Sequence, residues 1–200
     1  MQVKQLGALD QIELPPDFVL VDETFGRMAL DWKQQYNPPG DETVQIVFYY
    51  RGKAENTADT KTFRSVLDNG PFVYLAKNKV DNDINSVTLK LRLILGNVGD
   101  NQYSRKFTEY TGQHFNLTAF KVAPINGRLA IHVSGQFISV RDTIDYYYQG
   151  IFFDGTPGDK NCSIEEVFLQ TESEAQFENY QSAFEQSLAT IQWTHAATRI

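Results

Sequence analysis

The chain has 200 residues, 42% of them hydrophobic, and a formal net charge of −7. This length can bury a substantial core as one large domain, and two small domains are the alternative. The acidic balance, without any cluster of Lys and Arg, argues against nucleic acid as the main partner, because phosphate binding relies on clustered basic side chains. We predict one domain over residues 1–200, in which residues 194–200 form either a flexible tail or a docking segment.

Cysteine content and hydropathy bear on the cellular compartment. Cys162 is the only cysteine, so no intramolecular disulfide can form. The N-terminal residues 1–7 contain no apolar leader core, and no stretch approaches the roughly 20 apolar residues that span a bilayer. The sequence therefore predicts a cytoplasmic protein without a membrane span.

The first half of the chain is predicted to be rich in strands. Patterns of apolar and polar side chains favour strands over 18–21, 27–33, 43–50 and 86–95. The first two look like a short hairpin, and the Asn-Pro-Pro-Gly sequence that follows them breaks the chain. A short helix is expected over 59–67, where Phe63, Val66 and Leu67 would face inward.

The second half is predicted to be a four-strand meander. It follows a turn-rich linker at 69–85 and a helix over 103–115. Strands are favoured over 117–122, 128–138, 144–153 and 163–170. Asn126-Gly127 predicts a type I′ hairpin turn between the first two strands, because both residues tolerate positive φ.

A capped amphipathic helix ends the predicted fold. The sequence Ser173-Glu-Ala-Gln176 has the form of a capping box and predicts that a helix begins there. Steps of three and four residues place five apolar side chains on one side of it: Phe177, Tyr180, Phe184, Leu188 and Ile191. The predicted class is therefore α+β, with an antiparallel sheet flanked by helices.

Three segments of the second half resemble PsbP-like α/β/α sandwich proteins. They are Ile125-Asn-Gly-Arg-Leu-Ala-Ile131, the strand ending Tyr148-Gln-Gly-Ile-Phe-Phe153, and the helix pattern over 177–193. The resemblance covers roughly residues 106–193. The superfamily includes an extrinsic photosystem subunit, a Ran-binding nuclear import factor and bacterial DcrB-like proteins, some of which are adaptor chaperones for type VI secretion effectors. The resemblance implies a sandwich scaffold that binds other proteins, generally without catalysis.

The histidines show no pattern typical of a catalytic or metal site. His114, His132 and His195 are far apart in the sequence and lack a His-x-x-x-His spacing. His132 shares a predicted strand face with Ser134, but the sequence around Ser134 is not a nucleophile elbow. We interpret His132 as a partly exposed, hydrogen-bonded histidine of the sheet. We expect no catalytic residue, no bound metal and no cofactor.

Other reactive side chains are given structural interpretations. Residues 155–160 only faintly suggest a phosphate loop, since they lack the Gly-Lys-Ser/Thr ending and lead to a strand, so we interpret them as a hairpin loop. Cys162, close to Lys160, is interpreted as incidental rather than reactive. Glu165 and Glu166 are adjacent on a strand, so they should point to opposite faces, and we expect both to be solvated.

An acidic surface is the first candidate for partner binding. Residues 161–198 contain no Lys or Arg. The last helix should therefore present Glu174, Glu178 and Glu185 as an acidic face. A surface that serves solubility alone is the alternative.

An aromatic strand is the second candidate. Over 144–153, Tyr146 and Tyr148 point to one face and Tyr147 points to the other. In a three-layer sandwich both faces are covered, so core packing is the default interpretation. If one face is open, these three tyrosines are candidate partner contacts.

The leading hypothesis is a non-enzymatic protein-binding domain that acts as an adaptor, chaperone or assembly factor, in a bacterial and secretion-related setting. A different class of function is a small-molecule-binding or enzymatic domain with a pocket near Tyr146, Tyr147 and Tyr148 and near His132. The third hypothesis is a secreted bacterial effector that uses the same fold.

Overall fold

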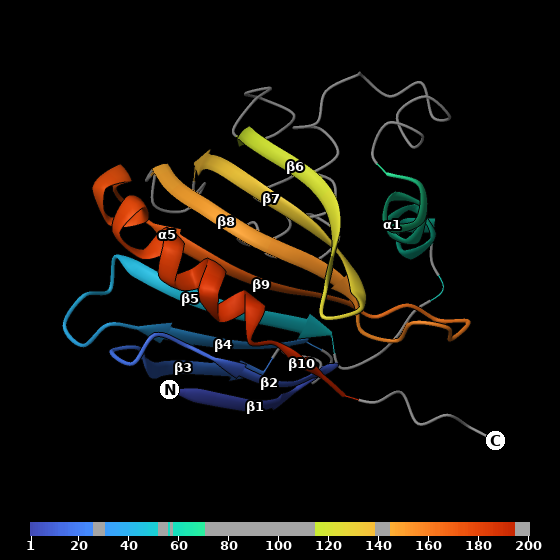
Figure 1. Ribbon diagram of the computed structural model, residues 1–200, viewed down its shortest axis with the longest axis horizontal. Coiled ribbons are helices and arrows are strands. Elements are labelled where there is room, and N and C mark those ends of the chain that lie inside the picture. Colours follow the sequence, from blue (N-terminus) through green and yellow to red (C-terminus); the bar gives the residue numbers. More distant parts are fainter. Residues whose placement is uncertain (26–30, 52–55, 57, 71–114, 139–144, 195–200) are drawn as a thin grey trace.

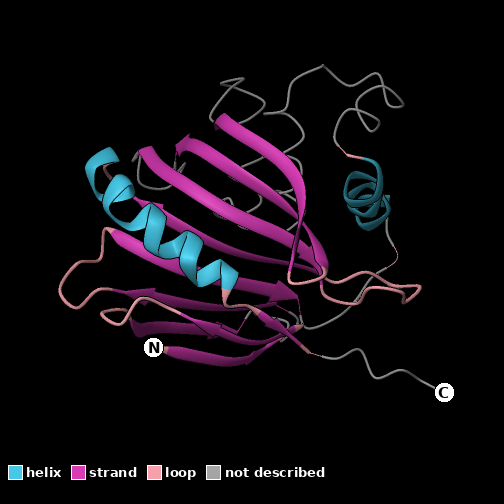
Figure 2. Cartoon of the chain, viewed as in Figure 1, coloured by secondary structure: helices cyan, strands magenta, loops and turns pink. Residues whose placement is uncertain are grey.

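The computed structural model describes residues 1–25, 31–51, 56, 58–70, 115–138 and 145–194. Its strands are β1 (Gln2–Leu6), β2 (Leu9–Glu13), β3 (Val19–Phe25), β4 (Asp31–Asn37), β5 (Val44–Arg51), β6 (Phe115–Ile125), β7 (Arg128–Ile138), β8 (Asp145–Asp154), β9 (Ile164–Thr171) and β10 (Gln192–Trp193). Its helices are α1 (Ala58–Asn69) and α5 (Glu174–Ala189) (Figures 1 and 2). The strand predicted over 86–95 and nearly all of the helix predicted over 103–115 lie outside the described residues, as do residues 195–200.

Seven of the described strands form one antiparallel sheet in the order β3-β4-β5-β9-β8-β7-β6 (Figure 1). Strands β6 to β9 are the predicted meander, since each pairs with the next along the chain. The pairing of β5 with β9, from Val44 opposite Thr171 to Tyr50 opposite Glu165, joins the N-terminal strands to this meander. The main sheet is therefore built from strands of both halves of the chain.

A second, smaller sheet in the order β1-β2-β10 is not predicted by the sequence pattern. Its buried side chains Val3, Leu6, Leu9 and Ile12 recur every three residues, both within the two short strands and across the turn between them. That spacing does not show the period of two that indicates a strand. Contacts with the core and with β10 therefore identify this hairpin, and local alternation does not.

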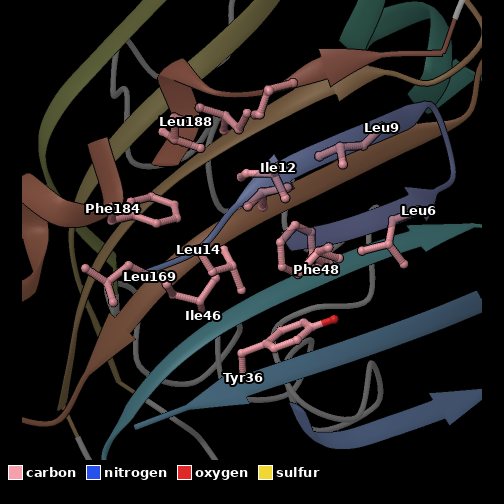
Figure 3. Close-up of a cluster of buried hydrophobic side chains, with 14 of the residues drawn as sticks. Leu6, Leu9, Ile12, Leu14, Tyr36, Ile46, Phe48, Leu169, Phe184 and Leu188 are labelled. Carbon is pink, nitrogen blue, oxygen red and sulfur yellow. The ribbon is translucent and has the colours of Figure 1, made fainter. Parts of the chain in front are cut away.

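The large sheet carries a hydrophobic core on each face. One face packs against α5 and the small sheet, and its core includes Leu6, Leu9, Ile12, Leu14, Tyr36, Ile46, Phe48, Leu169, Phe184 and Leu188 (Figure 3). The other face packs against α1, whose Phe63, Val66 and Leu67 are buried as predicted. The predicted α+β class, with an antiparallel sheet flanked by helices, is confirmed. The single domain over 1–200 stays a prediction.

Helix α5 begins at the predicted cap. The hydroxyl of Ser173 accepts a hydrogen bond of 3.3 Å from the backbone N–H of Gln176. The side-chain amide of Gln176 donates to Asp41 (3.1 Å) and Thr43 (2.6 Å), which ties the start of the helix to the turn before β5. The periodic apolar side faces the core, where Phe184 is buried.

The turn between β6 and β7 has the predicted type I′ character, with φ of 46° at Asn126 and 87° at Gly127. The side-chain amide of Asn126 donates to the carbonyls of Ala189 (3.1 Å) and Ile191 (2.7 Å). The turn thereby caps the C-terminal end of α5 and positions this helix over the meander.

We expect Gly127→Ala to lower the free energy of unfolding by about 1 kcal/mol, because an alanine is strained at positive φ. A Cβ at this position would meet no atom within 4 Å, so the effect isolates backbone conformation from packing. Urea unfolding followed by circular dichroism measures the change. An unaltered unfolding midpoint would contradict the assigned turn.

Candidate functional site

A cleft of about 580 Å³ lies between the C-terminal half of α5 and strands β6, β7 and β8. We call it the α5 cleft. Its polar lining residues are Lys121, Asn126, His132, Ser134, Gln149, Gln181 and Glu185. The sheet supplies the floor and α5 supplies one wall, so groups from distant parts of the sequence meet there.

Strand register explains why these polar side chains share the floor of the cleft. Lys121 lies opposite His132 in the β6–β7 pair, and Ser134 lies opposite Gln149 in the β7–β8 pair. Directly opposed residues point to the same face of a sheet. The prediction that His132 and Ser134 share a strand face is therefore confirmed. Ile131 belongs to the core on the opposite face.

His132 is half-buried at the edge of the α5 cleft. Burial lowers the pKa of His132 below its usual value, and the positive charge of Lys121 lowers it further. The backbone of Ala123 opposes this shift. Within the described part of the chain, the buried Nε2 atom has no hydrogen-bond partner. The prediction that His132 is partly exposed is confirmed, and its hydrogen bonding stays a prediction.

Gln149 is the second group with an unpaired buried atom. Its side-chain nitrogen donates a hydrogen bond of 2.9 Å to Oε1 of Glu185 on α5. That contact fixes the orientation of the amide, because the reversed amide would place its oxygen against the carboxylate. The buried Oε1 atom of Gln149 then has no partner among the described residues. Sequence analysis did not identify Gln149 as a site residue.

The structure separates the three candidate tyrosines. Tyr148 is fully buried and Tyr146 is 8% exposed, and both belong to the core beneath α1. Tyr147 points to the other face, where its ring centroid lies 6.2 Å from that of Phe177 on α5. Tyr146 and Tyr148 therefore follow the core interpretation, and Tyr147 alone lies half-buried beside the helix. Their contact with a partner stays a prediction.

The three candidate acidic residues all lie at the surface of α5, where Glu174, Glu178 and Glu185 are exposed. Glu185 lines the α5 cleft, and Glu178 lies about two turns earlier on the same helix. The structure therefore brings one predicted acidic contact together with His132 and Gln149. Partner binding by these residues stays a prediction.

The prediction that Glu165 and Glu166 are solvated is wrong. They point to opposite faces as expected, but Glu165 is 5% exposed and Glu166 is 1% exposed. Glu166 accepts a hydrogen bond of 2.5 Å from the hydroxyl of Tyr148. Central strand β9 lies between β5 and β8 and is covered on both sides, so a charged pair in its sequence is buried with it.

Glu165 attaches the N-terminal hairpin to the main sheet. It accepts a hydrogen bond of 2.9 Å from the backbone N–H of Ala8. A Cβ atom at Gly7 or at Gly155 would overlap the Glu165 carboxylate, so both glycines allow the close approach. Burial raises the pKa of Glu165 to about 7, although Ala8 and Arg128 oppose the shift. This carboxyl is enclosed by its own fold and does not line the α5 cleft.

A larger depression of about 1010 Å³ lies beside α1 and the β8–β9 loop. Of the two arginines that line it, Arg64 donates to Asp154 (2.7 Å) and to the carbonyls of Thr156 (2.9 Å), Asp159 (2.6 Å) and Asn161 (3.0 Å). The guanidinium therefore holds the loop at residues 155–160, which is a hairpin loop as predicted. The positive charge of Arg64 is therefore paired with groups of the chain itself.

Cys162 lies beneath the same loop and is buried. Burial raises the pKa of its thiol to about 12, and Asp154 adds to the shift while Arg64 opposes it. The thiol is therefore protonated at neutral pH and is a poor nucleophile. The structure places it in the core beneath α1.

No group of three or more His, Cys, Asp or Glu side chains within the described residues is arranged to hold a metal ion. None of the helices in that part of the chain is both long and apolar enough to cross a membrane.

The sequence matches no protein-family model and no curated protein at a significant level. Two solved structures share its architecture. The cyanobacterial PsbP protein CyanoP from Synechocystis aligns with a TM-score of 0.53 and 8% identity, over 97% of this chain and 92% of that chain. LpqN of Mycobacterium tuberculosis, which is involved in cell envelope biogenesis, aligns with a TM-score of 0.51 and 12% identity, over 97% of this chain and 90% of that chain. Identity this low shows the fold alone. The fold of this chain is therefore PsbP-like, as the sequence resemblance predicts.

Proposed function

We propose that this chain is a non-enzymatic protein-binding domain that acts as an adaptor, chaperone or assembly factor. The observation that supports the proposal is the α5 cleft, where an acidic helix lies over polar side chains of the sheet. Two buried atoms there, Nε2 of His132 and Oε1 of Gln149, have no hydrogen-bond partner among the described residues. Such a cleft offers both hydrogen bonds and charge to an incoming side chain. We place the activity in the cytoplasm, which fractionation of the native protein tests.

The PsbP-like resemblance favours the same class of function, because it implies a scaffold that binds other proteins. CyanoP and LpqN carry the fold in two bacteria, and LpqN is involved in cell envelope biogenesis. A bacterial accessory role related to secretion, exerted from the cytoplasm, is the setting that we propose.

A second exposed surface fits protein binding as well. Strand β3 lies at one end of the order of the described strands in the main sheet. Three consecutive apolar residues on it are exposed: Val19 by 42%, Leu20 by 47% and Val21 by 53%. Exposed apolar residues on an edge strand are typical of a contact surface.

We expect the tagged chain to capture a stoichiometric partner from a lysate of its own source. The triple variant Glu174→Gln, Glu178→Gln and Glu185→Gln should lose most of that partner, because it removes the negative charge of α5 and preserves its shape. The measurement is the partner-to-bait ratio on stained gels and by mass spectrometry.

Two variants control this experiment. Replacing Asp68, which is exposed on α1 across the sheet from α5, by Asn removes charge away from α5 and should leave capture unchanged. Replacing Leu20 by Ser tests the β3 edge, and a partner lost only in this variant would move the contact surface to β3. The absence of any captured protein would count against the proposed function.

Binding of a small molecule in the α5 cleft is the second candidate function. It is favoured by the convergence of His132, Ser134 and Gln149 on one enclosed floor, together with the two unpaired acceptors. A thermal-shift screen of metabolites distinguishes it, since a ligand that binds the folded state raises the melting temperature. A hit that is lost in Gln149→Leu would favour this alternative.

A further inference from the structure

We propose that the α5 cleft binds a basic side chain of the partner protein, and that arginine fits it better than lysine. This inference rests on the protein-binding function proposed above and names the chemistry of the partner. It follows from the hydrogen-bonding character of the cleft floor, the charge of its helical wall and the fixed orientation of Gln149.

Both unpaired atoms on the cleft floor are hydrogen-bond acceptors. The Gln149 amide nitrogen donates to Glu185, so its Oε1 atom is left as an acceptor. Burial lowers the pKa of His132 and so favours the neutral imidazole, in which one ring nitrogen is an acceptor, and we assign this role to the unpaired Nε2 atom. A ligand group that forms hydrogen bonds with both atoms must therefore carry N–H or O–H donors.

The wall formed by α5 adds negative charge. Glu185 lines the cleft, and the last turn of α5 contains no basic residue. The C-terminal end of a helix carries partial negative charge, so a cation is favoured there. Lys121 on β6 is the one basic residue that lines the cleft, and its exposed side chain opposes a cation. Replacing Lys121 by a neutral residue should therefore strengthen the binding of a cation, whereas replacing Glu185 should weaken it.

A ligand group that reaches the two acceptors passes beside the exposed hydrogen bond between Gln149 and Glu185. A carboxylate accepts several hydrogen bonds, so an entering cation can bind Glu185 while the Gln149 amide keeps its bond to Oε1. His132 lies opposite Ile151, so Gln149 is its diagonal neighbour on β8. A guanidinium group carries five N–H donors in one plane and can serve a carboxylate and a neighbouring acceptor together, whereas an ammonium group has three donors at one point.

The test is an NMR titration of the full chain with Nα-acetyl-arginine amide, following the side-chain signals of His132 and Gln149. We expect saturable shifts with a dissociation constant of about 1 mM. Glu185→Gln should weaken binding about five-fold or more, and Lys121→Gln should strengthen it about two-fold. Nα-acetyl-citrulline amide, a neutral molecule of the same shape, should bind at least about five-fold more weakly.

Two control variants complete the design. Asp68→Asn removes an exposed carboxylate on α1, which packs against the other face of the sheet, and should not alter the titration. Circular dichroism spectra and melting temperatures of each variant show whether it remains folded. Because Lys121 and Glu185 are exposed, their replacement should leave the fold intact.

Three results would overturn the inference: no saturable shift up to about 50 mM, equal binding of the citrulline compound, or no effect of Glu185→Gln. A partner captured from the lysate without any arginine binding would leave the proposed function standing and remove this inference. Arginine binding without a captured protein would remove the proposed function and the partner with it, and would leave a cleft that binds a free guanidinium compound.

Discussion

Replacing Arg64 by Met is expected to lower the free energy of unfolding by about 3 kcal/mol. The Arg64 side chain is 26% exposed and pairs with Asp154, whose side chain is 10% exposed, at 2.7 Å. Methionine keeps much of the aliphatic packing but leaves the Asp154 carboxylate and three loop carbonyls without this donor. Chemical denaturation measures the loss.

The double variant with Asp154→Asn tests the physical reason. If the unpaired carboxylate causes most of the loss, removal of its charge should recover about 1 kcal/mol relative to Arg64→Met alone. Hydrogen exchange should also show faster opening of residues 156–161, because Arg64 bonds this loop to α1. Lys61→Met on the exposed side of the same helix is the matched control. Equal stability of the two single variants would contradict the role of Arg64.

The second large effect is a dependence of stability on pH that originates at Glu165. Its pKa is about 7 in the folded chain, raised from 4.5 by burial. The folded state therefore binds the proton more tightly than the unfolded state does. The stabilisation by this proton is fully present below about pH 4.5 and is lost as pH rises through 7. The loss amounts to about 3 kcal/mol, since each pKa unit corresponds to about 1.4 kcal/mol.

Glu165→Gln should remove this part of the pH dependence and should make the chain more stable than the wild type at pH 8. A glutamine keeps an oxygen that can accept from the N–H of Ala8 and never carries the buried charge. The difference in unfolding free energy between the two proteins, measured from pH 4 to 9 in denaturant, isolates Glu165 from other titrating groups. Glu42→Gln controls for an exposed carboxylate. Parallel pH profiles would contradict the assignment.

Locally encoded elements could be predicted from the sequence. The turn at Asn126 and Gly127 depends on the φ angles that these two residues tolerate, and the start of α5 depends on Ser173 and Gln176. Such signals act between residues a few positions apart, so no knowledge of the packing is needed. The inward side of α1 follows from its helical period in the same way.

The N-terminal hairpin could not be predicted, because its stability depends on partners from the far end of the chain. The backbone N–H of Glu13 donates to Thr190 (2.8 Å), and the backbone N–H of Thr194 donates to the carbonyl of Ala8 (3.0 Å). Short strands with few residues rarely have a strong pattern of their own. Here the pairing partners decide the structure.

The candidate site was predictable in part. The shared strand face of His132 and Ser134 follows from the period of a strand, and the acidic surface of α5 follows from its composition. The meeting of Glu185 with Gln149 depends on how α5 lies across the meander, which the packing of Phe184 and the capping by Asn126 determine. Sequence spacing does not contain that information.

By itself the sequence determined the meander and the flanking helices, because period, turn residues and caps are properties of short segments. The PsbP-like class of the fold followed from the resemblance of three of these segments to a known family. The tertiary structure alone decided which charged side chains of β9 are buried. Glu165 is buried because an N–H group 157 residues away, at Ala8, compensates it, and Glu166 is buried because Tyr148 reaches it from the neighbouring strand. A charge is buried where the fold brings partners to it, and those partners come from distant positions in the chain.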